Sequence, residues 1–432
     1  MDMKVYRLCD TVPFKNGADP LWCSGNSTII RVGEDVFATN MRVFPERGRH
    51  SRTSLEVWAK RGSGSWQMEF FEEGVYQREP CPVMYIGGSV IGVTVNATNI
   101  VYPPEEENIG ALCTPKIYLF DVTDHLTLTQ VVTPRFDDPD YELNDHSYRG
   151  HALDSANGDL FLVNKYCLGE GSAHAWALLD KNYQTVRADK LVCPKRCCYH
   201  NIALHKGELY IFAVRDVEEF VLEWRDYKRE VTGEEWDYDM RAIYLKYSPD
   251  IRRQDPGEQI LIMDRDDTCG HVKNLDCMFT PEGDMLFVAS SKRIWHDFMR
   301  ARFFPNTPFD ATLEFFRLRG GKVIDRQVLD CSGKSEEINP KTLYWGGFQL
   351  DTEGKAHLFF TKKNAPEADS LKDGLYIVDI DANTLSAPRK ISNNTMGGEF
   401  FLSRERLGAK RTNQVDFYWK DEGGIYAGEY SL

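Results

Sequence analysis

The hydrophobic pattern of this chain repeats: an apolar run, a short polar turn that contains glycine, and then a second apolar or aromatic run. Two such runs joined by two to four turn residues predict a β-hairpin. The pattern occurs at five places, reading VMYIGGSVIGVTV from residue 83, HALDSANGDLFLV from 151, IALHKGELYIFAV from 202, CMFTPEGDMLFVA from 277 and FQLDTEGKAHLFF from 348. Repetition at a spacing of about 50 to 75 residues predicts a β-propeller in which each repeat is one blade.

We expect an all-β chain, a seven-bladed β-propeller of four-stranded antiparallel blades, with each hairpin as the inner half of its blade. Six predicted blades cover 22–71, 79–132, 146–192, 197–262, 270–330 and 342–391. The seventh takes its strands from 398–432 and is completed by the N-terminal run KVYRL at 4–8. Closing the ring with this strand protects an edge that otherwise presents unpaired backbone groups. Because each repeat packs on its neighbours, residues 1–432 are expected to form a single domain.

Four longer irregular stretches fall between the predicted strands, at 102–112, 133–145, 216–240 and 292–311. Loops of this length in a compact domain are often functional. The stretch 216–240 mixes acidic and aromatic residues, and a short helix is expected within it.

Composition narrows the possible partners. A formal charge of −14 and a pI near 5.3 argue against a nucleic-acid partner, although an anionic ligand fits if basic residues gather in one cleft. No apolar run approaches the roughly 20 residues that span a bilayer, so no membrane partner is expected. The eleven cysteines have irregular spacing and are expected to be mainly buried thiols; we expect no metal and no cofactor.

Candidate chemistry is most concentrated in the fourth predicted blade. Tyr199 stands at the start of its first strand and Arg215 at the end of its second. A hairpin brings these two positions to the same rim of the propeller, around the central channel. A guanidinium there could lower the cost of forming a phenolate and could bind a carboxylate through two hydrogen bonds.

The third predicted blade supplies the neighbouring wall. His146, Tyr148 and Arg149 precede its hairpin, and Lys165 and Tyr166 follow it. His146 is the expected titrating group, because imidazole changes charge near neutral pH. His151 and His200 are expected to pack or to form hydrogen bonds inside the blades.

Two segments carry a resemblance to a known family. YHNIALHKGELYIFAVR, residues 199–215, and DHSYRGHALDSANGDLFLV, residues 145–163, resemble the Tyr-hairpin-Arg and His-hairpin elements of seven-bladed propeller polysaccharide lyases of the ulvan lyase and rhamnose-glucuronate lyase type, with related propeller rhamnosidases. The likeness covers the third and fourth blades closely and the rest of the chain loosely. The family often has a second His where this chain has Lys165 and Tyr166, and Tyr148 rather than His146 could occupy the catalytic position.

The resemblance implies a polysaccharide lyase that cleaves a uronic-acid-containing glycan by β-elimination at the rim of the channel. Arg215, helped by Arg149 or Lys165, would neutralise the uronate carboxylate. A base would then remove the C5 proton while an acid protonates the departing O4, with Tyr199 doing both or sharing the work with His146. The same resemblance implies export to the periplasm or the outside, although the N-terminus shows no signal peptide and a cytoplasmic location stays open.

Further residues at predicted strand starts and ends could bind an acidic polysaccharide or oligosaccharide, since aromatic faces stack on sugar rings and basic side chains hold anionic groups. These substrate-binding candidates are Tyr148, Arg149, Lys165, Tyr166, Asn274, Lys292, Arg293 and Trp345. The protein is expected to act as a monomer.

Two other functions remain open from the sequence. One is a glycoside hydrolase on the same propeller, rhamnosidase-like or sialidase-like; it would normally need two carboxyl groups across the scissile bond, and the predicted rim offers few acidic residues. The Asp-box motif of sialidases is absent. The other is a non-catalytic carbohydrate-binding propeller, since a fold alone does not give a function.

Overall fold

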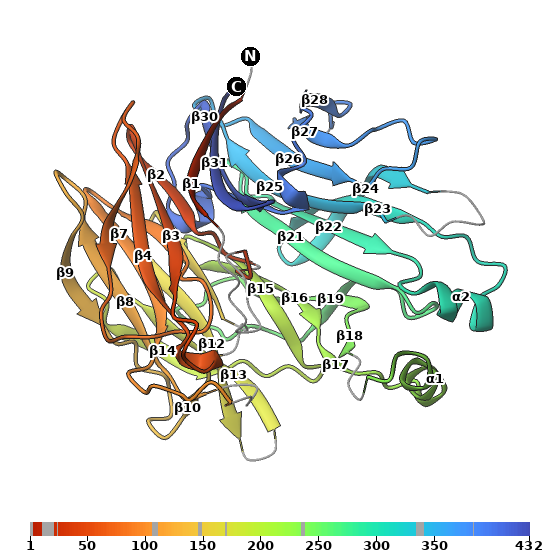
Figure 1. Ribbon diagram of the computed structural model, residues 1–432, viewed down its shortest axis with the longest axis horizontal. Helices are drawn as coiled ribbons and strands as arrows, with labels where there is room; N and C mark the ends of the chain where they lie inside the picture. The colour runs from red at the N-terminus through yellow and green to blue at the C-terminus, as the bar shows by residue number, and fades with distance from the viewer. Residues whose placement is uncertain are drawn as a thin grey trace.

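A computed structural model describes residues 3–10, 21–23, 25–105, 111–145, 149–168, 171–234, 238–333, 341–382 and 384–432. Seven antiparallel sheets form a ring in chain order (Figure 1). This confirms the predicted seven-bladed propeller of four-stranded blades. No helix in the described ranges is long and apolar enough to cross a membrane.

The first three blades contain the following strands. Blade one has β2 (Ile29–Val32), β3 (Asp35–Val43), β4 (Thr53–Lys60) and β5 (Trp66–Phe71), with a short 3-10 helix η1 (Arg49–Ser51) between β3 and β4. Blade two has β6 (Val83–Gly87), β7 (Val90–Ala97), β8 (Thr114–Asp121) and β9 (Thr127–Val132). Blade three has β11 (Gly150–Asp154), β12 (Asp159–Leu168), β13 (Gly171–Leu179) and β14 (Thr185–Lys190), and a fifth strand, β10 (Glu142–Leu143), pairs with β12.

The next three blades repeat the same order. Blade four has β15 (Cys197–His205), β16 (Glu208–Arg215), β19 (Ala242–Ser248) and β20 (Ile260–Asp264), with a small ribbon of β17 (Val217–Glu218) and β18 (Tyr238–Asp239) beside it. Blade five has β21 (His271–Phe279), β22 (Met285–Lys292), β23 (Ala311–Arg319) and β24 (Lys322–Ser332). Blade six has β25 (Leu343–Leu350), β26 (Ala356–Lys363), β27 (Gly374–Ile380) and β28 (Arg389–Ser392), followed by the 3-10 helix η2 (Met396–Gly398).

Blade seven closes the ring with strands from both ends of the chain. Its strands are β29 (Phe400–Leu402), β30 (Gln414–Asp421), β31 (Gly424–Ser431) and, from the N-terminus, β1 (Lys4–Asp10). β1 pairs antiparallel with β31, with Lys4 opposite Glu429. The N-terminal strand therefore covers the last edge, as the sequence predicted.

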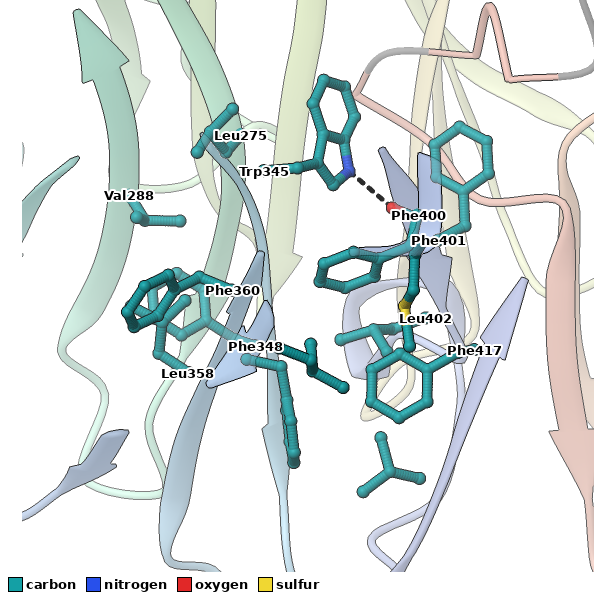
Figure 2. Close-up of a cluster of buried hydrophobic side chains, with 14 of the residues drawn as sticks. Leu275, Val288, Trp345, Phe348, Leu358, Phe360, Phe400, Phe401, Leu402 and Phe417 are labelled. Carbon is teal, nitrogen blue, oxygen red and sulfur yellow. Dashed lines mark hydrogen bonds between the residues drawn. The ribbon is translucent and has the colours of Figure 1, made fainter. Parts of the chain in front are cut away.

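The core lies between the blades, where apolar side chains of one sheet pack on the next. Figure 2 shows one such contact, in which aromatic rings from β25, β29 and β30 meet. Phe400 and Phe417 lie edge to face at 5.5 Å, and the indole N–H of Trp345 donates to the carbonyl of Phe400 at 2.5 Å. A buried indole N–H needs such a partner, so Trp345 joins blade six to blade seven.

Two helices extend from the ring beside blades four and five (Figure 1). They are α1 (Leu222–Thr232), inside the stretch where a short helix was expected, and α2 (Asp297–Phe303). Their aromatic side chains hold them together: the rings of Tyr227 and Phe303 lie 5.5 Å apart. α1 ends at Gly233, whose φ of 72° is the left-handed conformation that glycine adopts readily.

A third 3-10 helix, η3 (Glu405–Leu407), follows β29 and lies inside the ring. It contacts the inner strands β6, β11, β15 and β21 of blades two to five. Gly408, directly after η3, lies against Tyr85 and Leu153 near the ends of β6 and β11, so this segment occupies the centre of the ring on the side where these inner strands end. The opposite rim, where the inner strands begin, carries the predicted site residues.

Candidate active site

Tyr199 lies in a β-bulge at the beginning of blade four. Cys198 pairs with Val214 and Asn201 pairs with Phe212, so two residues of β15 face one residue of β16. The φ of Tyr199 is 54°, in the left-handed region that non-glycine residues rarely adopt. Bulges re-aim side chains near functional sites, and strain of this kind persists only where the surroundings hold it.

Two neighbouring elements hold this bulge. The side-chain amide of Asn274, on β21, donates to the backbone carbonyl of Tyr199 at 2.6 Å and to that of Phe212 at 3.2 Å. The side chain of Trp22 hydrogen-bonds the Tyr199 hydroxyl. Asn274 is itself buried, so its amide supports the backbone of Tyr199 and does not face solvent.

The Tyr199 phenol is half-buried and stays protonated at neutral pH. Burial raises its pKa well above the ordinary value, Cys198, Asp216 and Glu79 raise it further, and the Trp22 hydrogen bond lowers it in part. A protonated phenol that reaches solvent can donate a proton to a leaving group. This environment favours Tyr199 as an acid over Tyr199 as a resting base.

An arginine and a glutamate that precede blade two complete this part of the rim. Arg78 lies with its guanidinium 5.6 Å from the centre of the Trp22 ring and 3.9 Å from the carboxylate of Glu79. Arg78 and Glu79 are not among the candidates predicted from the sequence. Their signal was the one used for His146, a charged residue placed just before an inner strand.

Arg215 lies at the same end of the blade-four hairpin as Tyr199, because Cys197 of β15 pairs with Arg215 of β16. Its guanidinium is bound by two carboxylates, Asp239 at 2.6 Å and Asp266 at 2.9 Å, and its side chain is 3% exposed. These ion pairs fasten the β17–β18 ribbon to the blade. Arg215 therefore makes protein contacts where the sequence predicted a guanidinium open to substrate.

Blade three places its candidates at different depths. Lys165 is half-buried on β12 and close enough to Cys198 to lower the pKa of that thiol, although burial raises it more. Tyr166 is buried and stacks on Tyr141 at 4.2 Å, and Arg149 is buried with its guanidinium on the carbonyl of Pro80. Of these three, Lys165 alone is open enough to meet a ligand near Tyr199.

Four histidine and tyrosine residues remain from the predictions for the blade-three wall and its surroundings; two lie outside the described residues and two are buried. His146 and Tyr148 lie outside the described residues. His151 and His200 are buried, which agrees with packing roles, and the ring of His200 lies 4.8 Å from that of His174.

A small cationic pocket lies between blades five and six; we call it the lysine pocket. Its lining includes Lys273, Lys292 and Trp295. Burial, together with the charges of Lys341 and Lys273, lowers the pKa of Lys292 to about 8. The ammonium of Lys292 lies 5.1 Å from the centre of the Trp295 ring. Clustered lysines beside an indole that is 36% exposed can bind an anionic sugar.

Other rim candidates in blades five and six already form ion pairs or packing contacts within the protein. Arg293 pairs with Asp310 at 2.7 Å, and Lys273 pairs with Glu399 at 3.2 Å. Trp345 is buried, with the ammonium of Lys273 5.6 Å from the centre of its ring. Trp345 therefore packs beneath the side chain of Lys273 and is not open to a ligand.

No family model and no curated protein matches the sequence. Among solved structures, the fold resembles the Penicillium chrysogenum α-L-arabinanase (10% identity over 79% of this chain and 90% of that one, TM-score 0.42) and the exo-β-1,3-galactanase of Clostridium thermocellum (10% identity, 99% and 97%, TM-score 0.40). It also resembles the N-terminal domain of Nup159 (9% identity, 99% and 95%, TM-score 0.42). Carbohydrate-processing propellers are thus among its neighbours, together with a protein of another kind, and at these TM-scores the likenesses carry nothing about reaction or substrate.

Proposed function

We propose that this protein is a polysaccharide lyase that cleaves a uronate-containing glycan by β-elimination at the Tyr199 rim. The observation that carries the proposal is that one rim holds both the half-buried, protonated phenol of Tyr199 and the lysine pocket, in a chain whose net charge is −14. An acidic protein that gathers cations at one rim is suited to an anionic ligand. The family resemblance of residues 145–163 and 199–215 supplies the reaction type.

In the proposed step, a base takes the C5 proton, the C4–O4 bond breaks, and Tyr199 gives its hydroxyl proton to the departing O4. The electron pair of the C5–H bond becomes the C4=C5 double bond. Lys165 would be the cation that stabilises the negative charge developing on the uronate carboxylate, next to Tyr199, as the C5 proton leaves. The base is assigned to His146, on the sequence argument alone.

Arg215 takes a different role in this proposal. Since Asp239 and Asp266 occupy its guanidinium, it is a positioning residue that steadies the end of the Tyr199 hairpin. Substrate anions further along the glycan would be bound in the lysine pocket.

A glycoside hydrolase receives less support from the same geometry. The carboxylates described at this rim lie against cations. Glu79 is paired with Arg78, Glu399 with Lys273, and Asp216 with Arg196 at 3.6 Å. A hydrolase needs one carboxyl group as acid and a second as base or nucleophile.

The test is incubation with a panel of uronate glycans while ultraviolet absorbance is followed. Elimination creates a double bond conjugated to the carboxylate, so absorbance should rise with each cut. Tyr199→Phe should abolish this rise with the fold intact. Tyr183→Phe is the matched control, because Tyr183 is also half-buried with a left-handed φ of 60° but lies in the outer turn of blade three. The appearance of new reducing ends without a rise in ultraviolet absorbance would show that the protein is a hydrolase and not a lyase. Normal turnover by Tyr199→Phe would show that Tyr199 has no part in the mechanism.

A further inference from the structure

The axis of the propeller contains a charge imbalance that the proposed reaction does not use. Arg404 and Arg406, on either side of Glu405 in η3, both contact the same carboxylate oxygen of Asp276, at 3.0 and 3.1 Å. All three charged side chains are 2% exposed. Two guanidiniums therefore share one carboxylate in the buried centre of the ring.

The guanidiniums of Arg404 and Arg406 differ in their hydrogen-bond partners. Arg406 also donates to the carbonyl of Ile202 and to the side-chain oxygen of Asn201, each at 3.2 Å. The Nη1 of Arg404 contacts Asp276, but in the described part of the chain its Nε has no hydrogen-bond partner. A buried charged donor without a partner is costly, so an additional group is needed at this point.

The surroundings of Arg404 add positive charge. Burial and the charge of Arg406 lower the pKa of Arg404 to about 10, against the opposing effect of Asp276. The charges of Arg149 and Arg404 both lower the pKa of the buried Cys23 thiol, against the larger effect of burial, so Arg149 lies in the same region.

At the edge of this region the positive charge of Arg78 is balanced by the negative charge of Glu79, 3.9 Å away. Among the groups described there, guanidiniums exceed carboxylates by two.

We propose that the axis binds a small inorganic anion, with chloride as the ion to test, at the unpartnered Nε of Arg404. A buried donor without an acceptor and an excess of positive charge favour an anion over a water molecule. The site is small, because the ring of Phe401 lies 5.9 Å from the guanidinium and the thiols of Cys23 and Cys277 lie close by. A sugar carboxylate does not reach it, since Arg404 is 1% exposed. The inference is therefore independent of the proposed lyase activity.

The bound anion would stabilise the ring from its centre. It would offset the repulsion between Arg404 and Arg406 and so hold η3 against the inner strands of blades two to five. An ion that binds the folded state alone stabilises it by mass action, so stability should rise with chloride concentration.

The first experiment is thermal unfolding of the full chain in sodium chloride and in sodium gluconate at equal ionic strength. We expect the Tm to rise by about 1–2 °C for each tenfold increase in chloride and to stay flat in gluconate. Arg404→Met should lose this dependence. Arg31→Met is the matched control, because Arg31 is also buried and binds Asp416 through two hydrogen bonds of 2.6 Å, and it should keep the dependence.

The second experiment uses the unmodified protein, so it does not depend on the folding of a variant. Crystals soaked in bromide should show an anomalous peak within hydrogen-bond distance of Arg404 Nε. Bromide peaks on the outer surface alone, or a chloride dependence that Arg404→Met retains in full, would overturn the proposal.

Discussion

The side-chain amide of Asn274 in blade five donates to the carbonyl of Tyr199 in blade four at 2.6 Å. This hydrogen bond joins two neighbouring blades. It holds Tyr199 in its left-handed conformation, which no other described residue of β15 adopts. The geometry of the proposed acid thus depends on a neighbouring blade and not on its own strand alone.

Asn274→Ala should reduce both stability and activity. Two backbone carbonyls lose their donor, which costs about 1–3 kcal/mol, and the Tyr199 bulge relaxes, so kcat should fall by about tenfold or more. Denaturant unfolding and turnover measure the two effects.

The matched control is Gln349→Ala. Gln349 is buried and donates to the carbonyls of Thr412 and Gln414, and it lies at the other end of blade six from the rim. It should lose similar stability and keep kcat. Equal loss of kcat in both variants would mean that Asn274 acts through stability only.

Substrate binding should weaken as the pH rises through about 8. Lys292 is cationic below its pKa of about 8 and neutral above it, so the lysine pocket loses charge in that range. The KM for a uronate oligosaccharide should therefore increase there. Lys292→Arg keeps the charge, and its KM should stay flat over the same range.

The control for this pH series is Lys322→Arg, at an exposed position on β24. It should reproduce the increase in KM seen with the unmodified protein. A KM that rises equally in Lys292→Arg would assign the pH dependence to another group.

Arg215→Met should mainly affect stability. Removing Arg215 leaves the buried Asp239 with the longer ion pair to Arg241, at 3.4 Å. With a discount for the 38% exposure of Asp266, we expect a loss of about 2–3 kcal/mol. The KM should change by less than about twofold, because this guanidinium contacts protein carboxylates.

The comparison variant is Arg253→Met, which removes an exposed ion pair with Asp250 and should change stability by less than about 0.5 kcal/mol. Denaturant unfolding and steady-state kinetics are measured on both variants. A large rise in KM with little loss of stability in Arg215→Met would restore the substrate-binding role predicted from sequence.

Glu405→Gln should stabilise the protein at high pH only. Burial raises the pKa of Glu405 to about 7, above its ordinary value near 4.5, with Arg411 opposing. The neutral form is therefore the favoured one in the folded protein, and stability is lost as the pH rises from the ordinary pKa through 7. The Tm of Glu405→Gln should exceed that of the unmodified protein at about pH 8 and match it at about pH 4, by calorimetry. A gain of equal size at both pH values would point to packing instead.

The number of blades and their boundaries could be predicted from sequence because the signal is local. A hairpin needs only two apolar runs and a turn, as at 202–214, and the unpaired edge of blade seven points to a strand from the other terminus. The hairpin also correctly placed Tyr199 and Arg215 at one end of blade four.

What each side chain does there was decided by tertiary structure. Arg215 meets Asp266, which lies 51 residues later in the chain, and no local pattern predicts that partner. Arg406 likewise meets Asp276 across 130 residues, in a centre that exists only when all seven blades have closed. Periodicity determines which face of a strand is buried, whereas the pairing of buried charges depends on which blades meet, because a charge out of water is stabilised by the partner that folding brings to it.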